Sequence, residues 1–185
     1  MYTMESFLYR EVNRASRERD VSKVETLGPY AWVLRKIVEV GQLLRKKSKW
    51  EDSQLILFRG LGIFREQLED IIKAKEQQSF IILEGFQSSS LKKSVAEVFA
   101  LQQRNKVNGR VPCVYLIEFF DSLFYFDMNS KVFSAFYTSE REILLMDGLQ
   151  YQVINVKDLT AVEGYGYYYI HLRCSGNNNK LGVSE

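Results

Sequence analysis

Three polar motifs of the chain combine residue types that could do chemistry. In chain order they are Arg59-Gly60, Phe86-Gln-Ser-Ser-Ser90 and Glu140-Arg141-Glu142. An arginine side chain can form bidentate charged hydrogen bonds with an anionic group. A carboxylate can stabilise positive charge that develops at a reacting centre, or act as a general base. Each motif borders a short apolar run typical of a strand, so we expect a cleft between sheets to gather the three motifs.

The third motif holds two carboxylates in close succession. In an extended chain, residues i and i+2 point to the same side and lie roughly 6.5 to 7 Å apart. We therefore expect Glu140 and Glu142 to face the same cleft while Arg141 points away from it. One carboxylate could then stabilise a group while its bond to a leaving group breaks. The other carboxylate could receive the nucleophile that attacks this group.

Apolar residues that recur every three or four positions predict the helices that support these motifs. One helix occupies the start of the chain, and others are expected over residues 63–72 and 91–99, the last capped by one of the preceding serines. A further helix should begin near Pro29, because proline suits the first helical turn. Its expected apolar stripe is Val33, Ile37, Val40 and Leu44.

Short apolar runs bounded by polar or turn residues predict strands. The expected strands are residues 54–58, which end at Arg59-Gly60, then 80–83, 111–120, 124–127, 132–136, 143–146, 151–156 and 167–173. Asp147-Gly148 is typical of a hairpin turn. Helices in the first third and strands later predict an α+β fold, with N-terminal helices and two packed, mostly antiparallel sheets.

The composition excludes several other classes of protein. One His (His171) and two Cys (Cys113 and Cys174) are too few for a Cys₄ or Cys₂His₂ zinc site or for a disulfide framework, and we expect no metal. The formal net charge of +2 argues against a protein held to nucleic acid by its overall charge. No apolar run approaches the ~20 residues of a membrane span. We expect a single domain over residues 1–185, excised from a longer protein.

Taken together and in order, the motifs resemble those of the Arg-Ser-Glu class of mono-ADP-ribosyltransferases, the family of clostridial binary toxins and vertebrate arginine-specific transferases. The run Leu57-Phe-Arg-Gly-Leu61 resembles the Arg-Gly motif of the family's first strand. The segment 86–90 resembles its aromatic-x-Ser-Thr-Ser motif, with Ser89 in place of Thr, and 140–142 resembles its Glu-x-Glu motif. Weaker matches at Tyr2-Thr3, Tyr9, Asn13, Met146-Asp-Gly148 and Tyr151-Gln-Val153 extend the resemblance over nearly the whole chain.

The resemblance implies a cleft that binds NAD⁺ as co-substrate and a reaction that transfers ADP-ribose and releases nicotinamide. It implies that Arg59 binds the pyrophosphate and that the backbone of Gly60 meets the nicotinamide amide. Ser88 would hold the catalytic carboxylate and the nicotinamide ribose in place. Glu142 would stabilise the oxocarbenium-like sugar, as carboxylates do in glycosidases.

The resemblance also implies an acceptor. In the family a Glu at the first position of the Glu-x-Glu motif goes with arginine acceptors, so Glu140 predicts transfer to an arginine of a partner protein. Two further NAD-binding residues are expected with open alternatives. Phe99 could stack on nicotinamide or belong to the core, and Arg104, like Arg110, could cover the dinucleotide or lie in a solvated loop.

Other interpretations remain at this point. The same site could hydrolyse NAD⁺ with water as the acceptor, or the domain could be a catalytically dead module that binds a nucleotide or a protein. Singly, the arginine could be part of a surface ion pair, the serines a cap and turn, and the glutamates a solvated strand edge. We expect a monomer that binds neither nucleic acid nor membrane. It would be a cytoplasmic or secreted effector, and the two distant Cys favour the cytoplasm.

Overall fold

The computed structural model describes residues 7–45, 55–103, 109–119, 125–128 and 141–176. In these parts of the chain eight strands form one mixed sheet with the order β2-β7-β8-β4-β1-β3-β6-β5. β4 and β8 pair in parallel, and all other neighbours pair antiparallel. The strands are β1 (Leu55–Phe64), β2 (Phe80–Leu83), β3 (Gln87–Ser90), β4 (Arg110–Phe119), β5 (Tyr125–Asp127), β6 (Glu142–Leu145), β7 (Leu149–Asp158) and β8 (Tyr168–Gly176).

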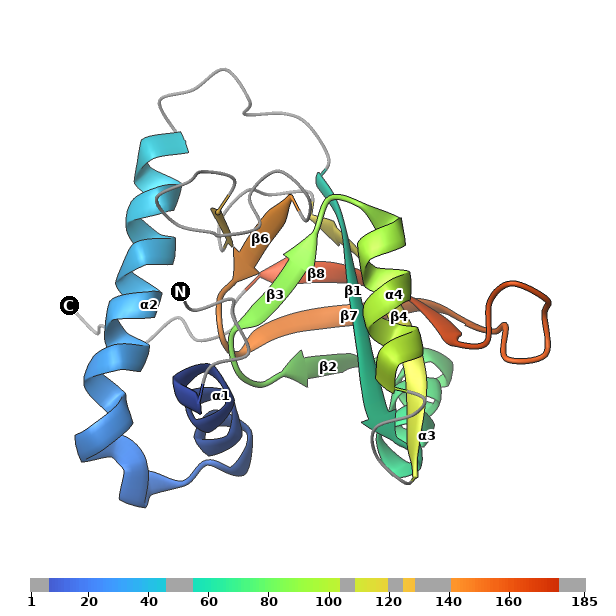
Figure 1. The fold of residues 1–185 in the computed structure, drawn as a ribbon, viewed down its shortest axis with the longest axis horizontal. Coiled ribbons are helices and arrows are strands. Elements are labelled where there is room, and N and C mark those ends of the chain that lie inside the picture. The colour runs from blue at the N-terminus through green and yellow to red at the C-terminus, as the bar shows by residue number, and fades with distance from the viewer. Residues whose placement is uncertain (1–6, 46–54, 104–108, 120–124, 129–140, 177–185) are drawn as a thin grey trace.

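The sheet has a narrow junction, which we call the seam, between β1 and β3. Among the described residues, Phe58 and Ser90 are the one pair between these strands, whereas β1 pairs with β4 along its whole length. Figure 1 shows β3 and β6 rising steeply across the direction of β7 and β8. We call β2-β7-β8-β4-β1 the large part of the sheet and β3-β6-β5 the small part. The expectation of two packed sheets is wrong, because the Phe58–Ser90 pair continues the ladder from one part into the other.

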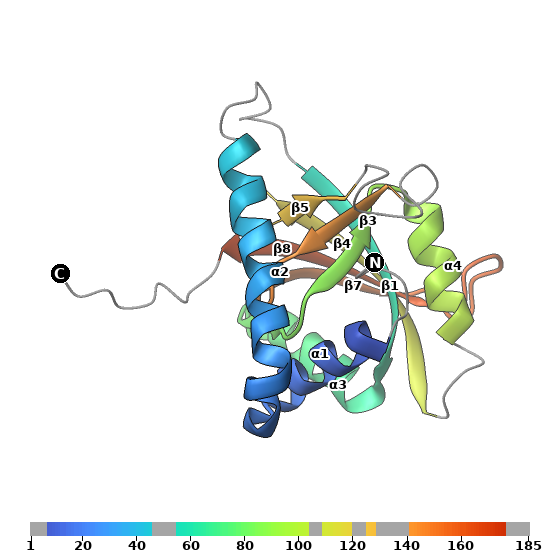
Figure 2. The same cartoon turned by 60° about the vertical axis from the view of Figure 1, so that its left-hand side comes forward.

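The helices occupy both sides of this sheet (Figure 2). They are α1 (Phe7–Glu18), α2 (Val24–Arg45), α3 (Arg65–Glu76) and α4 (Lys93–Gln103). Leu68 and Ile71 of α3 are buried in the main core with Leu57 and Leu172. On the opposite face, Ala96 and Ala100 of α4 form a second cluster with Val114 of β4.

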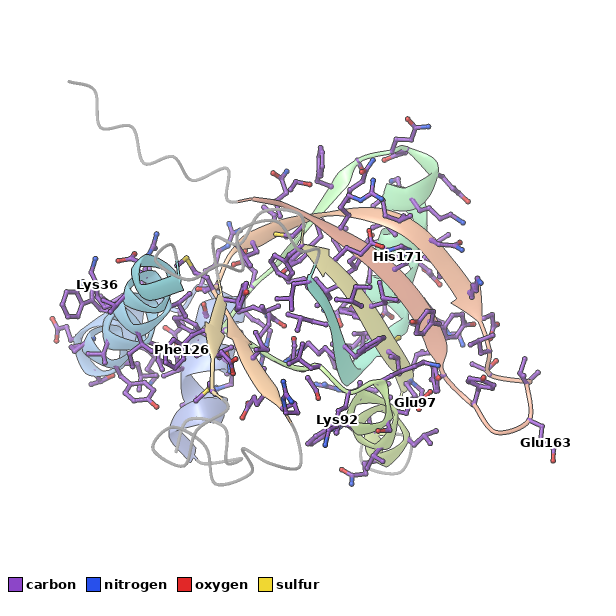
Figure 3. The ribbon with its side chains drawn as sticks, turned by 90° about the horizontal axis from the view of Figure 1, so that it is seen from above. Lys36, Lys92, Glu97, Phe126, Glu163 and His171 are labelled. Carbon is purple, nitrogen blue, oxygen red and sulfur yellow. The ribbon has the colours of Figure 1, made fainter. Side chains whose placement is uncertain are left out.

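The connection between β7 and β8 folds onto α4. The hydroxyl of Tyr167 donates to Glu97 at 2.6 Å. Lys93 lies over the rings of Tyr165 and Tyr169, and pairs with Glu97 at 3.1 Å. Figure 3 shows Glu97 on α4 and Glu163 at the tip of this connection. The tyrosine-rich segment therefore fastens α4 to the sheet.

Helix α2 differs from its sequence prediction in its start and in its buried face. It begins at Val24, so Pro29 lies inside the helix. A short 3₁₀ turn, capped by the side chain of Asp20, precedes Val24 and continues directly into the helix. Among the side chains of α2 that the structure describes, Leu34 and Val38 are buried, whereas Val33 and Val40 of the expected stripe are about half exposed. The side chain of Leu44 lies outside the described ones.

Three strand predictions also need correction. β1 runs on to Phe64, so Arg59 and Gly60 stand in the middle of a strand instead of at its end. The serines of segment 86–90 belong to β3 instead of a turn. Asp147-Gly148 connects β6 and β7, which are not neighbours in the sheet, so this turn does not form a hairpin. The expected strand 132–136 lies outside the described residues.

No helix in the described part of the chain is long and apolar enough to cross a membrane.

Candidate active site

Arg59 stands at the centre of β1, opposite Tyr115 of β4. Alternation along the strand puts its side chain on the same face as Leu57, which is fully buried in the core. The guanidinium Nη1 donates a hydrogen bond across the seam to the backbone carbonyl of Ser88. A long cationic side chain from the large part of the sheet is thus fixed on a backbone acceptor of the small part.

Ser88 and Glu142 complete the chain of contacts. Glu142 is the first residue of β6, a strand whose four residues are all buried, and only 1% of its surface is exposed. The hydroxyl of Ser88 donates to Glu142 Oε1. Ser90 is directly opposite Glu142 in the ladder, so Ser88 reaches the carboxylate along the diagonal on the same face. The structure therefore brings Arg59, Ser88 and Glu142 together, although they are far apart in sequence.

The backbone on either side of Glu142 is fastened by two other segments. The carbonyl of Arg141 accepts the Leu91 N–H at 3.1 Å, and the carbonyl of Glu142 accepts the Met128 N–H at 3.0 Å. Arg141 has φ +49°, in the left-handed region that non-glycine residues seldom adopt. The chain is therefore not extended at Arg141, and the expected same-side geometry of Glu140 and Glu142 does not follow. Glu140 itself lies outside the described residues.

Two buried phenols share the surroundings of Arg59. Burial raises the pKa of Tyr115 and Tyr151, and the nearby Arg59 charge opposes that rise in both. Both side chains therefore stay neutral phenols beside the guanidinium. Among the described residues, neither Arg59 Nε nor the Tyr151 hydroxyl has a hydrogen-bond partner, although both are buried. Tyr115 was not singled out from the sequence, because only the strand register shows that it is opposite Arg59.

Gly60 lies where α4 approaches β1 most closely. A Cβ atom on Gly60 would lie 1.8 Å from the backbone oxygen of Ala96 and 2.7 Å from the backbone nitrogen of Ala100. The glycine thus allows α4 to rest directly on β1, a requirement that the sequence motif alone does not reveal. Its expected contact with nicotinamide stays a prediction.

The remaining expected site residues are placed as follows. Phe99 of α4 is 37% exposed, since the helix buries Ala96 and Ala100 instead. Arg104 lies outside the described residues. Arg110 begins β4, where it donates to the Gly62 carbonyl at 3.1 Å and lies over the Phe64 ring.

His171 lies apart from Arg59, Ser88 and Glu142. It is on β8, 2.9 Å from Glu118 of β4, and Arg173 contacts the other oxygen of the same carboxylate. In the described part of the chain, no three His, Cys, Asp or Glu residues are grouped as metal ligands would be.

Comparisons with known proteins give matches among solved structures. No protein-family model and no curated protein sequence matches the chain. The ADP-ribosyltransferase HopU1 of Pseudomonas syringae pv. tomato DC3000 matches with a TM-score of 0.62 at 17% identity, over 90% of this chain and 65% of that one. C3stau2 from S. aureus, solved with NAD, matches with a TM-score of 0.59 at 16% identity, over 91% of this chain and 82% of that one.

A third match is Vis, an ADP-ribosyltransferase toxin from Vibrio splendidus, solved in complex with agmatine. Its TM-score is 0.60 at 14% identity, over 91% of this chain and 68% of that one. At such identities the matches show the fold alone. The chain has the fold of mono-ADP-ribosyltransferase toxins and spans about two thirds of the length of HopU1.

Proposed function

We propose that the chain is an NAD-dependent mono-ADP-ribosyltransferase of the Arg-Ser-Glu class, which transfers ADP-ribose to an arginine of a partner protein. The observation that carries the proposal is the contact chain from Arg59 through Ser88 to Glu142 across the seam. The fold shared with ADP-ribosyltransferases supports it. So does the chemistry of the three groups, which comprise a cation for a pyrophosphate, a hydroxyl and a buried carboxylate.

Each residue has a distinct task in this proposal. Among the described residues the Arg59 guanidinium donates from Nη1 alone, to the Ser88 carbonyl, so it keeps further N–H donors for an anionic oxygen of NAD⁺. Ser88 holds Glu142 through its hydroxyl. Glu142 stabilises the positive charge that develops on the ribose while the bond to nicotinamide breaks. A buried carboxylate suits this task, because its charge is little screened by water.

The proposal that the acceptor is an arginine rests on Glu140 and on the family resemblance. A glutamate at this position can orient a guanidinium and accept its proton, whereas a glutamine cannot act as a base. The structure of Vis with agmatine supports the same acceptor chemistry, because agmatine carries a guanidinium group. The partner we propose is therefore a protein with an accessible arginine.

The test is a paired measurement of nicotinamide release and of label transferred from NAD⁺ to agmatine. Glu142→Ala should lower both rates about 10²- to 10³-fold, as loss of a preorganised transition-state group does, with NAD⁺ affinity nearly unchanged. Arg59→Ala should weaken NAD⁺ binding by about 1.5–3 kcal/mol, the worth of a hydrogen bond to a charged group.

The matched control is Glu118→Gln, which alters another largely buried carboxylate that contacts His171 and Arg173. It should leave both rates unchanged. Near-normal turnover by folded Glu142→Ala, or a wild-type protein that never consumes NAD⁺, would contradict the proposal.

Glu140→Gln tests the acceptor. Because bond cleavage depends on Glu142, this variant should still hydrolyse NAD⁺ while transfer to agmatine falls steeply. Label on protein that hydroxylamine removes would support arginine transfer, and free ADP-ribose alone would support an NAD⁺ glycohydrolase. Equal loss of both activities would show that the two glutamates act as one unit.

A further inference from the structure

The three residues of the candidate site stand on two parts of the sheet, so their geometry depends on how those parts are joined. Arg59 is on the large part, and Ser88 and Glu142 are on the small part. One residue pair, Phe58–Ser90, joins the ladders at the seam. The two parts share the main core, in which Leu144 of β6 is buried with Leu57 of β1, but so short a ladder leaves directional contacts elsewhere to set their orientation in detail.

The chain passes between the two parts four times, and two of these passages are three-residue connections, which we call the two crossings. Residues 84–86 lead from β2 of the large part to β3, and residues 146–148 lead from β6 back to β7. Asp147 in the second crossing binds the first, because its Oδ1 accepts the backbone N–H of Gly85. The N–H of Gly148 also donates to the carbonyl of Leu83 at 3.3 Å. The two crossings are thus held side by side.

Helix α1 contacts the same two crossings. The hydroxyl of Ser16 donates to Asp147 Oδ2 at 2.7 Å, so both oxygens of this carboxylate are used. Gly85 has φ +82°, and a Cβ atom there would lie 2.6 Å from the side-chain oxygen of Asn13, which is buried. The helix therefore presses directly on the backbone that leads to Ser88.

The side chain of Gln87 binds the backbone of the first crossing, residues 84–86. Its amide nitrogen donates to the carbonyl of Glu84 at 2.9 Å and to that of Gly85 at 2.6 Å. Gln87 is buried and directly precedes Ser88. The crossing, its contact with Asp147 and the start of β3 thus form one hydrogen-bonded unit.

We propose that Asp147 is a positioning residue, which sets the place of Ser88 and Glu142 relative to Arg59 by tying the two crossings to each other and to α1. This inference rests on the proposed function of the site. Asp147 stands five positions after Glu142 on the chain, and it binds a residue three positions before Ser88. It therefore acts on both members of the Ser88–Glu142 pair without touching either.

The expected effect separates binding from catalysis. Since the proposed pyrophosphate contact is made by Arg59, whose backbone belongs to the large part, Asp147→Ala should change the KM for NAD⁺ by less than about threefold. The kcat should fall about tenfold to a hundredfold, because misplacement by about 1 Å can cost a factor of 10². Asp147→Asn should restore most of kcat, since the amide oxygen can accept from Gly85 and the amide nitrogen can donate to Ser16.

The control for a merely structural role is Ile71→Val, which removes a buried methyl group from α3 on the core of the large part. It should lower the thermal midpoint and leave kcat unchanged at temperatures well below that midpoint. If Asp147→Ala does not fold, Ser16→Ala removes only the contact with α1 and should lower kcat more weakly. An unchanged kcat in Asp147→Ala, or in this substitute, would overturn the proposal.

Amide hydrogen exchange tests, independently of turnover, whether Asp147 holds the small part of the sheet in place. In Asp147→Ala the amides of β3 and β6 should exchange at least about tenfold faster, while those shared by β1 and β4 stay protected. Unchanged exchange in β3 and β6 would overturn the inference even if activity were lost. A wild-type protein without NAD⁺ turnover would refute the proposed function. The exchange result would still decide whether Asp147 holds β3 and β6 in place.

Discussion

Gly60→Ala should destabilise the domain far more than an exposed glycine substitution does. The added Cβ would lie 1.8 Å from the Ala96 oxygen and 2.7 Å from the Ala96 carbonyl carbon and the Ala100 nitrogen. All three are backbone atoms of α4, so no side chain can rotate away and the helix itself must move by more than 1 Å. Overpacking of a core ordinarily costs about 1–3 kcal/mol, and we expect this change to reach or exceed the upper end of that range.

Thermal unfolding measures the effect. At about 2–4 °C per kcal/mol for a chain of this size, the midpoint should fall by roughly 6–12 °C. Gly62→Ala is the matched control on the same strand, because its Cβ would meet only side-chain atoms of Gln103 and Arg110, at 3.0 Å or more. Equal midpoints for the two variants would refute the close approach of α4 to β1.

Three further predictions concern the supports of α4 and the core. Tyr167→Phe removes the hydrogen bond to Glu97 and should lower the free energy of unfolding by about 1.5–3 kcal/mol in urea titrations. Ser90→Ala removes the acceptor of the Lys92 N–H just before α4 and should cost about 0.5–1.5 kcal/mol by the same measurement, the net worth of a hydrogen bond, with β3 still formed. Burial raises the pKa of Cys113 from 9.0 to about 12, so the stability held by its neutral thiol is complete below pH 9 and is lost as the pH rises towards 12. Cys113→Ala should flatten the decline of the thermal midpoint over that interval, and an unchanged slope would contradict this assignment.

The candidate site residues could be proposed from sequence because their motifs occur together and in order beside apolar runs typical of strands. Arg59, Ser88 and Glu142 all lie within or at the start of strands, and the structure joins them by hydrogen bonds. The end of β1 could not be predicted in the same way. Gly60 and Gly62 interrupt its apolar run, yet pairing with β4 extends the strand to Phe64 against their low strand propensity.

Tertiary contacts also decided the other differences. Helix α2 carries apolar residues on two faces, and only packing selects Leu34 and Val38 over Val33 and Val40. Asp147-Gly148 has the composition of a hairpin turn, but the aspartate side chain is engaged by Gly85 and Ser16. The left-handed conformation of Arg141 has no sequence signal, because arginine seldom adopts it.

The position of β8 has a consequence for how the polypeptide acquires its shape. This strand is the last of the described chain, yet it lies inside the sheet, between β7 and the parallel strand β4. Its partners in β4 precede it by 55 positions, as in the pair of Glu118 and Arg173. Pairings between segments so distant in sequence form slowly, because a long loop must close before they can contribute. A chain emerging from the ribosome would therefore lack the middle of its sheet until residues near Gly176 had been released, and premature termination before β8 would leave β4 and β7 with open edges prone to aggregation.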